Sequence, residues 1–151
     1  MDDTPAAPID HFDDPDRPGW QVWRVRDRTN YNAFLDPLSL RVENGVARVQ
    51  MMPRTGHANL HCSVHGGVLL GFIDIGLFAG AHALGAAGAG RGLTLDLSTQ
   101  FVSAARMDRV LEARIELLRE TGRMLFLRGL LVQEGEPVIA SFTATLRKVS
   151  T

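Results

Sequence analysis

The stretch that decides the fold is residues 65–84, with the sequence HGGVLLGFIDIGLFAGAHAL. It is apolar on nearly every face of a helix, and it is followed by Gly85, Gly88 and Gly90. The length and the glycine-rich end favour a helix, and a helix that is apolar all round is normally buried. The sequence therefore predicts one long central helix from about residue 65 to residue 84.

Segments on both sides of this helix have the period of β-strands. Before it, residues 37–54 alternate around Asn44-Gly45, which is the strongest short signal for a hairpin turn. After it, segments beginning near residues 93, 111, 123 and 138 alternate apolar and polar side chains. We expect these four strands to form an antiparallel meander in chain order. The predicted fold class is α+β, with an antiparallel sheet wrapped around the helix.

The first 19 residues differ from the rest of the chain in composition. They contain six aspartates, four prolines and a single arginine, with too little apolar surface to become ordered. We expect a disordered acidic tail at residues 1–19 and one folded domain at residues 20–151. Residues 20–35 should pack on that domain, with a period that fits helix and strand equally.

Composition also limits the partners and the compartment. The net charge is −1, and outside the acidic tail 15 basic residues face 11 acidic ones, which suits a small anionic ligand but not nucleic acid. One cysteine, Cys62, excludes an internal disulfide and fits a reducing compartment. The N-terminus lacks the pattern of a signal peptide, and residues 55–90 are too rich in Gly and His for a membrane span. We expect a cytoplasmic protein without nucleic-acid or membrane partners.

Asp74 is the one formally charged residue between Arg54 and Arg91, and it falls in the middle of the predicted helix. Burial of an unpaired carboxylate is costly and raises its pKa. The residue is therefore either structural, hydrogen-bonded or facing solvent, or it is a candidate general base. Residue type alone supports both interpretations equally.

Residues 59–67, NLHCSVHGG, lie where the helix should begin. Free backbone N–H groups at a helix start can bind an oxyanion or a polarised carbonyl, and glycines leave them accessible. Asn59 can donate from the loop, and His65 can hold the loop or donate to the same carbonyl. The alternative is a helix start that needs glycine for close packing and a histidine as its cap.

Asn59, His65-Gly66-Gly67 and Asp74 together resemble the signature of phenylacetic-acid-degradation-type (PaaI-like) hotdog thioesterases. That signature has Asn six residues before the His and an acid nine residues after it. Residues 93–97 and 121–123 are also similar to the family pattern, and the resemblance covers residues 38–149. The chain departs from the pattern at Cys62, where the family usually has glycine. A side chain there could narrow the pocket or alter the loop.

The resemblance implies an acyl-CoA thioesterase with the hotdog fold. It implies a dimer, commonly doubled to a tetramer, whose sites lie between subunits, with no metal or organic cofactor beyond the coenzyme A of the substrate. Asp74 would act as base or nucleophile, Gly66 and Asn59 would polarise the carbonyl with help from His65, and Thr94 would orient the water. The candidate substrate-binding residues are Gly67, Arg91 and Arg106, with Phe72, Phe78, Leu69 and Met51 or Met52 as candidate pocket lining.

Other interpretations remain open at this point. His57, His61 and His65 recur every four residues beside Cys62, but Pro53 and Gly56 indicate a loop rather than the helix that a metal face needs. Cys62 and Ser63 lack the Gly-x-Ser-x-Gly context of a nucleophilic hydrolase. A non-catalytic acyl-CoA-binding sensor is the main alternative function, and a hotdog hydratase is the alternative enzyme.

Overall fold

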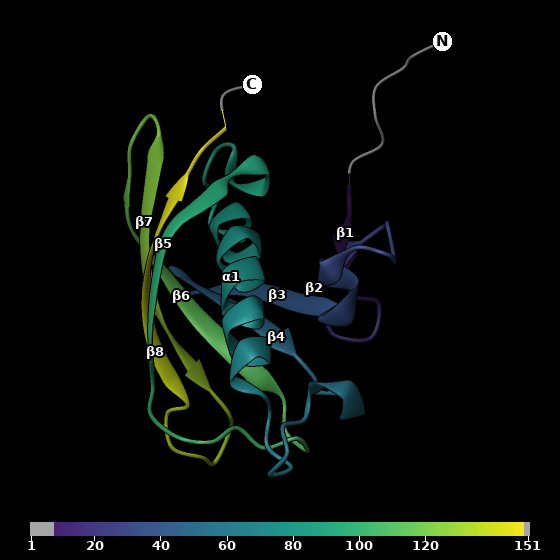
Figure 1. Cartoon of the computed structure of the whole chain (residues 1–151). Coiled ribbons are helices and arrows are strands. Elements are labelled where there is room, and N and C mark those ends of the chain that lie inside the picture. The colour runs from purple at the N-terminus through teal and green to yellow at the C-terminus, as the bar shows by residue number, and fades with distance from the viewer. Residues whose placement is uncertain (1–7, 150–151) are drawn as a thin grey trace.

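The computed structural model describes residues 8–149 and contains one long helix enclosed by a single curved sheet (Figure 1). The elements in chain order are β1 (Ile9–Asp13), β2 (Gln21–Val25), η1 (Tyr31–Phe34), β3 (Leu38–Glu43), β4 (Val46–Met51), η2 (Thr55–His57), α1 (Gly66–Ala83), η3 (Ala89–Arg91), β5 (Leu93–Phe101), β6 (Leu111–Glu120), β7 (Met124–Val132) and β8 (Ala140–Arg147).

The eight strands form one antiparallel sheet in the order β1-β2-β3-β4-β6-β7-β8-β5. Figure 1 shows the sheet curling around α1, with β5 and β8 on one side of the helix and β1 and β2 on the other. The prediction of a sheet wrapped around one long helix is therefore confirmed, and so is the hairpin at Asn44-Gly45. Both turn residues have positive φ, 51° and 74°, as a tight two-residue turn requires.

The predicted four-strand meander is wrong at β5. Strands β6, β7 and β8 do follow one another, but β5 pairs with β8, and β6 pairs with β4. The connection after β5 leaves the sheet edge and passes the start of α1, where the Val64 N–H donates to the Ala105 carbonyl at 2.9 Å. Consequently β5 is an edge strand with no neighbour on its other side in the described chain.

The prediction of disorder for residues 1–19 is wrong from Ile9 onward. Residues Ile9–Asp13 form β1, which pairs along its whole length with β2, so the folded part begins before residue 20. Residues 1–7 lie outside the described part of the chain. Few apolar residues are needed here because β1 is an edge strand that is largely exposed, and the composition of the segment therefore concealed it.

Helix α1 agrees with the predicted range to within a residue at each end. Its buried face includes Phe72, Ile73 and Leu77. Gly80 lets it approach the sheet closely, because a Cβ atom there would lie 3.0 Å from Ile115 Cδ1. Length and hydropathy alone would also suit a membrane span, although the helix is more than half buried by the sheet.

One stripe of α1 is only partly covered within the protomer, although apolar residues on nearly every face predicted a buried helix. We call it the open stripe. Its residues are exposed or only half-buried, and they recur at helical spacing along one face of the helix: Gly67, Leu70, Gly71, Asp74 and Phe78.

Candidate active site

Asp74 lies on the open stripe and is held by a neighbouring strand. The Thr94 hydroxyl of β5 donates a 2.6 Å hydrogen bond to Asp74 Oδ1. The pairing of β5 with β8 shifts register between Thr94 and Asp96, and such a bulge re-aims the side chains beside it. The carboxylate is half-buried rather than fully buried, and its second oxygen has no partner among the described residues. The candidate base is thus oriented but accessible.

The start of α1 presents a free donor. His65 is the N-cap, and its Nδ1 accepts the Gly67 N–H at 2.9 Å, so the proton of the neutral ring is on Nε2. The His65 carbonyl accepts the N–H groups of Val68 and Leu69. The Gly66 N–H, in contrast, donates to no acceptor in residues 8–149. An unpaired N–H at a helix start can polarise a carbonyl oxygen.

The Asn59 side chain is fixed by the loop that precedes the helix. Its Oδ1 accepts the N–H groups of His61 at 2.8 Å and Ser63 at 3.0 Å, which leaves the amide NH₂ group as a donor. Cys62 in this loop has φ 61°, in the left-handed region that glycine usually occupies. The departure from the family pattern at Cys62 therefore leaves the left-handed backbone at this position in place.

The two halves of this chemistry are far apart within one protomer. Gly66 and Asp74 are eight residues apart in the same helix, which corresponds to about 12 Å along its axis. A single thioester carbonyl cannot contact both groups of one chain. One protomer therefore provides two half-sites, the carboxylate with Thr94 and the donors at the helix start.

The predicted substrate-binding residues differ in how free they are to contact a substrate. Arg91, in η3, has no ion-pair partner within residues 8–149 and is available for a phosphate. Arg106 donates to both oxygens of Asp108, at 2.9 and 2.8 Å, and lowers the pKa of Asp108 to about 2. The Gly67 N–H is used by His65, and Phe72 is fully buried on the side of α1 opposite Asp74.

His57 is a fully buried residue whose role had no signal in the sequence. Its Nδ1 accepts the Arg54 N–H at 3.0 Å, and its Nε2 lies 2.6 Å from the Phe34 carbonyl, so the ring joins η1 to η2. Its carbonyl accepts the His65 N–H at 2.8 Å. His61 and Cys62, by contrast, are exposed in the loop that Pro53 and Gly56 predicted for this segment.

Tyr31 is the second residue near the candidate site whose position the sequence did not indicate. It lies against α1 at Gly71, one turn before Asp74. A glycine inside an apolar helical segment was the available signal, because such a residue often marks a close approach. A surface cavity of about 600 Å³, lined by Arg48, Glu112 and Gln133 among others, is on the outer face of the sheet and contains none of these groups.

Comparison with known proteins shows the family to which this chain belongs. The family model described as the Thioesterase superfamily matches residues 61–140, more than half of the chain. No curated protein matches. A variant of the phenylacetic acid degradation protein PaaI from Thermus thermophilus is 26% identical, with 78% of this chain and 96% of that chain covered and a TM-score of 0.62.

Two further solved structures share the fold. Zebra fish thioesterase superfamily member 2 is 16% identical, with 82% of this chain and 89% of that chain covered and a TM-score of 0.70. A hypothetical thioesterase from Streptococcus pneumoniae, solved with Coenzyme A, is 16% identical, with coverage of 80% and 91% and a TM-score of 0.66. The fold is therefore the hotdog fold, and this chain belongs to the Thioesterase superfamily as a PaaI-like hotdog thioesterase.

Proposed function

We propose that this protein hydrolyses acyl-CoA thioesters at composite sites between two copies of the chain. One observation carries the proposal: the Asp74 carboxylate is oriented by Thr94 on an open stripe, while the matching Gly66 N–H is unpaired about 12 Å away. The coenzyme A bound to the Streptococcus pneumoniae protein supports this class of substrate. We expect a cytoplasmic enzyme that needs no metal or organic cofactor.

The proposed mechanism uses donors from one subunit and the acid from the other. The thioester oxygen accepts hydrogen bonds from the Gly66 N–H and the Asn59 amide, with His65 Nε2 as a further donor. Asp74 removes a proton from water as the water attacks the carbonyl carbon, or it attacks the carbon itself to give an anhydride that water then cleaves. In both routes the C–S bond breaks, and the coenzyme A thiolate leaves and takes up a proton.

Strand β5 supplies a surface on which a second copy can pair. Its outer edge is free in the described chain, and the exposed fractions of Leu93, Leu95 and Phe101 are 57%, 51% and 48%. Free, apolar strand edges favour pairing with another chain. Thr94 is part of the same strand, so a second subunit on β5 would lie beside Asp74. A dimer of such dimers is the larger assembly that we expect.

The first test is thiol release from phenylacetyl-, benzoyl-, hexanoyl- and palmitoyl-CoA by the wild type and by Asp74→Asn. Loss of a positioned base should lower kcat by about 10²–10⁴. An Asp74→Asn variant within a few-fold of wild type would show that another group drives the reaction. Binding of acyl-CoA without any turnover would instead indicate a sensor.

The composite site is tested by coexpressing two variants that are impaired separately, Asp74→Ala and Asn59→Asp. Asp at position 59 keeps an oxygen acceptor for the His61 and Ser63 N–H groups but removes the amide donor. In mixed dimers one site carries both substitutions and the other carries neither, so about a quarter of the wild-type activity should return. A site built from one chain would show no recovery.

A further inference from the structure

Tyr31 occupies a position on α1 that only a glycine permits. A Cβ atom on Gly71 would overlap the Tyr31 hydroxyl oxygen and lie 3.2 Å from Cζ, so the ring end rests directly on the helix backbone. The Tyr31 side chain is nevertheless 57% exposed. It therefore covers part of the open stripe rather than filling the core, and its ring end packs on Gly71.

The location of Tyr31 relative to Asp74 links it to the substrate. Gly71 precedes Asp74 by three residues, which is about 4.5 Å along the helix and about 60° around it. Thr94 approaches Asp74 from β5, on one side of the open stripe, and Phe101 of β5 lies near Gly66 on the same side. Tyr31 comes from η1 and bounds the other side. The acyl chain of a thioester whose carbonyl carbon lies next to Asp74 therefore begins between β5 on one side and Tyr31 on the other.

Charge distinguishes the two directions along the open stripe. Arg91 precedes Thr94 by three residues, and Arg147 pairs with Leu93 in the adjacent strand. Neither arginine has an ion-pair partner in residues 8–149. The phosphates of coenzyme A are favoured at this end, where cations are free. The acyl group is then directed toward the helix start, where Leu70, Phe101 and Tyr31 are exposed.

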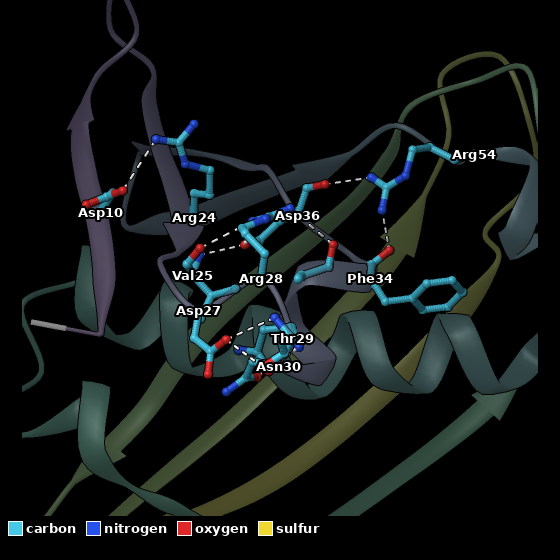
Figure 2. A network of polar contacts seen from close by, with 12 residues as sticks. Asp10, Arg24, Val25, Asp27, Arg28, Thr29, Asn30, Phe34, Asp36 and Arg54 are labelled. Atoms are coloured by element: carbon cyan, nitrogen blue, oxygen red, sulfur yellow. Dashed lines mark hydrogen bonds and ion pairs between the residues drawn. The ribbon is translucent and has the colours of Figure 1, made fainter.

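The segment that carries Tyr31 is held on several sides. Arg54 donates to the carbonyls of Asp36 and Phe34, and Arg28 donates to the Asp36 carboxylate at 3.1 Å (Figure 2). The Asn30 side chain caps η1 by accepting the Asn32 N–H at 3.1 Å. A wall fixed in this way can discriminate between acyl groups, because it does not simply move aside for a larger one.

From these contacts we infer that Tyr31, seated on Gly71, is a specificity-determining residue that limits the length of the acyl group. The inference rests on the proposed function, because it assumes that Asp74 acts on a thioester. It predicts a preference for short or compact acyl groups, since the ring blocks the open stripe one turn from the acid. Tyr31 has no part in the chemical step itself.

The test compares kcat/KM for a series from butyryl- to palmitoyl-CoA. Tyr31→Ala should raise the ratio of long-chain to short-chain kcat/KM by about tenfold or more, because space for even one methylene changes selectivity strongly. Tyr31→Phe, which keeps the ring, should leave the ratio unchanged, and Tyr31→Trp should lower it. The matched control is Phe12→Ala, which removes an exposed aromatic side chain from β1 rather than from η1. It should leave the ratio unchanged.

Gly71→Ala provides a second variant, because its Cβ must displace the ring. It should shift the ratio in the same direction as Tyr31→Ala, and adding it to Tyr31→Ala should have little further effect. An unchanged ratio of kcat/KM values in folded Tyr31→Ala, or an equal loss of kcat/KM for every substrate, overturns the inference. The proposed function still stands in that case, provided that the wild type turns over acyl-CoA and that this turnover depends on Asp74. Absence of wild-type turnover overturns both.

Discussion

The two flanks of α1 differ in how completely their buried polar groups are paired within one protomer. On the N-terminal flank, formed by β1, β2 and η1, Asp36 is buried and accepts the Val25 N–H as well as Arg28 (Figure 2). On the β5 flank, apolar side chains are exposed, and Thr99 Oγ1 is buried without a partner in the described structure. The buried carboxylate of the first flank is paired within one chain, whereas the second flank has a buried hydroxyl group without a partner among the described residues.

This difference separates stability from function. Hydrogen bonds that are satisfied within the protomer stabilise the fold, and their loss should appear mainly in the free energy of unfolding. Groups left unpaired within the protomer, such as the Gly66 N–H, contribute little to the free energy of unfolding but are available to a substrate. Substitutions of the satisfied groups should therefore lower mainly stability, and substitutions of the unpaired groups should lower mainly activity.

Among the substitutions that compare the two flanks, the largest effect is expected at the helix start, from Gly66→Pro compared with Gly66→Ala. Gly66 is the first residue of α1, where proline is well tolerated, and His65 has φ −61° and ψ 135°, which suits a residue before proline. The N–H is the single hydrogen-bonding group that proline removes, so kcat/KM should fall by about 10²–10³ while the melting temperature is maintained.

Gly66→Ala is the control for that prediction. It keeps the N–H, and its Cβ would lie 3.8 Å from Phe101 Cζ, an ordinary contact. Near wild-type activity is expected, measured by thiol release alongside thermal unfolding. Equal losses in the two variants would mean that the N–H is not the donor and that crowding at the helix start explains the effect.

The comparison is tested from the other flank by Asp36→Ala. Alanine leaves the buried Val25 N–H without its acceptor and removes the partner of Arg28, so unfolding in urea should become easier by about 1–3 kcal/mol. Activity per folded molecule should fall much less than in Gly66→Pro.

Asp36→Asn is the matched variant, because it keeps an acceptor oxygen without the charge. Burial raises the pKa of Asp36, which shows that the negative charge is unfavourable there despite Arg28 and the Val25 N–H. The asparagine variant should therefore lose less stability than the alanine variant. An equal loss in both would attribute the stabilisation to the ion pair rather than to the backbone hydrogen bond.

How much the sequence could predict follows the same division. The helix and the Asn44-Gly45 hairpin follow from local patterns, and the family resemblance at Asn59, His65 and Asp74 predicted the groups of both proposed half-sites. The position of β5 could not be predicted in this way, because strand order depends on a connection that crosses the helix start rather than on any local pattern.

The burial of Phe72 away from Asp74 could have been predicted from the sequence by helix geometry. Two residues of an α-helix separate Phe72 from Asp74 by about 160° around the axis, so the two side chains cannot share one face. The structure accordingly buries Phe72 completely. Tyr31, in contrast, lies far before Gly71 in the chain, and no periodicity connects them; only the packing of η1 on the helix does.

The smallest effect is expected from pH at the junction of β1 with the end of α1. The ring of His82 lies 5.3 Å from that of His11 and 5.2 Å from that of Trp23. Burial against these rings, and then the charge of His11, lower the pKa of His82. The unfolded chain therefore binds a proton more readily, and stability should decrease as the pH falls below about 6.5.

His82 remains partly exposed to solvent despite these contacts, and solvent screens its charge, so this decrease should be only a fraction of a kcal/mol. Urea unfolding of the wild type and of His82→Gln at about pH 7.5 and about pH 5.5, one unit on either side of the ordinary histidine pKa, measures it. The variant should show a weaker pH dependence, because its side chain does not titrate. If both proteins lose the same stability, acid acts elsewhere, and the contact of β1 with α1 is insensitive to the charge of His82.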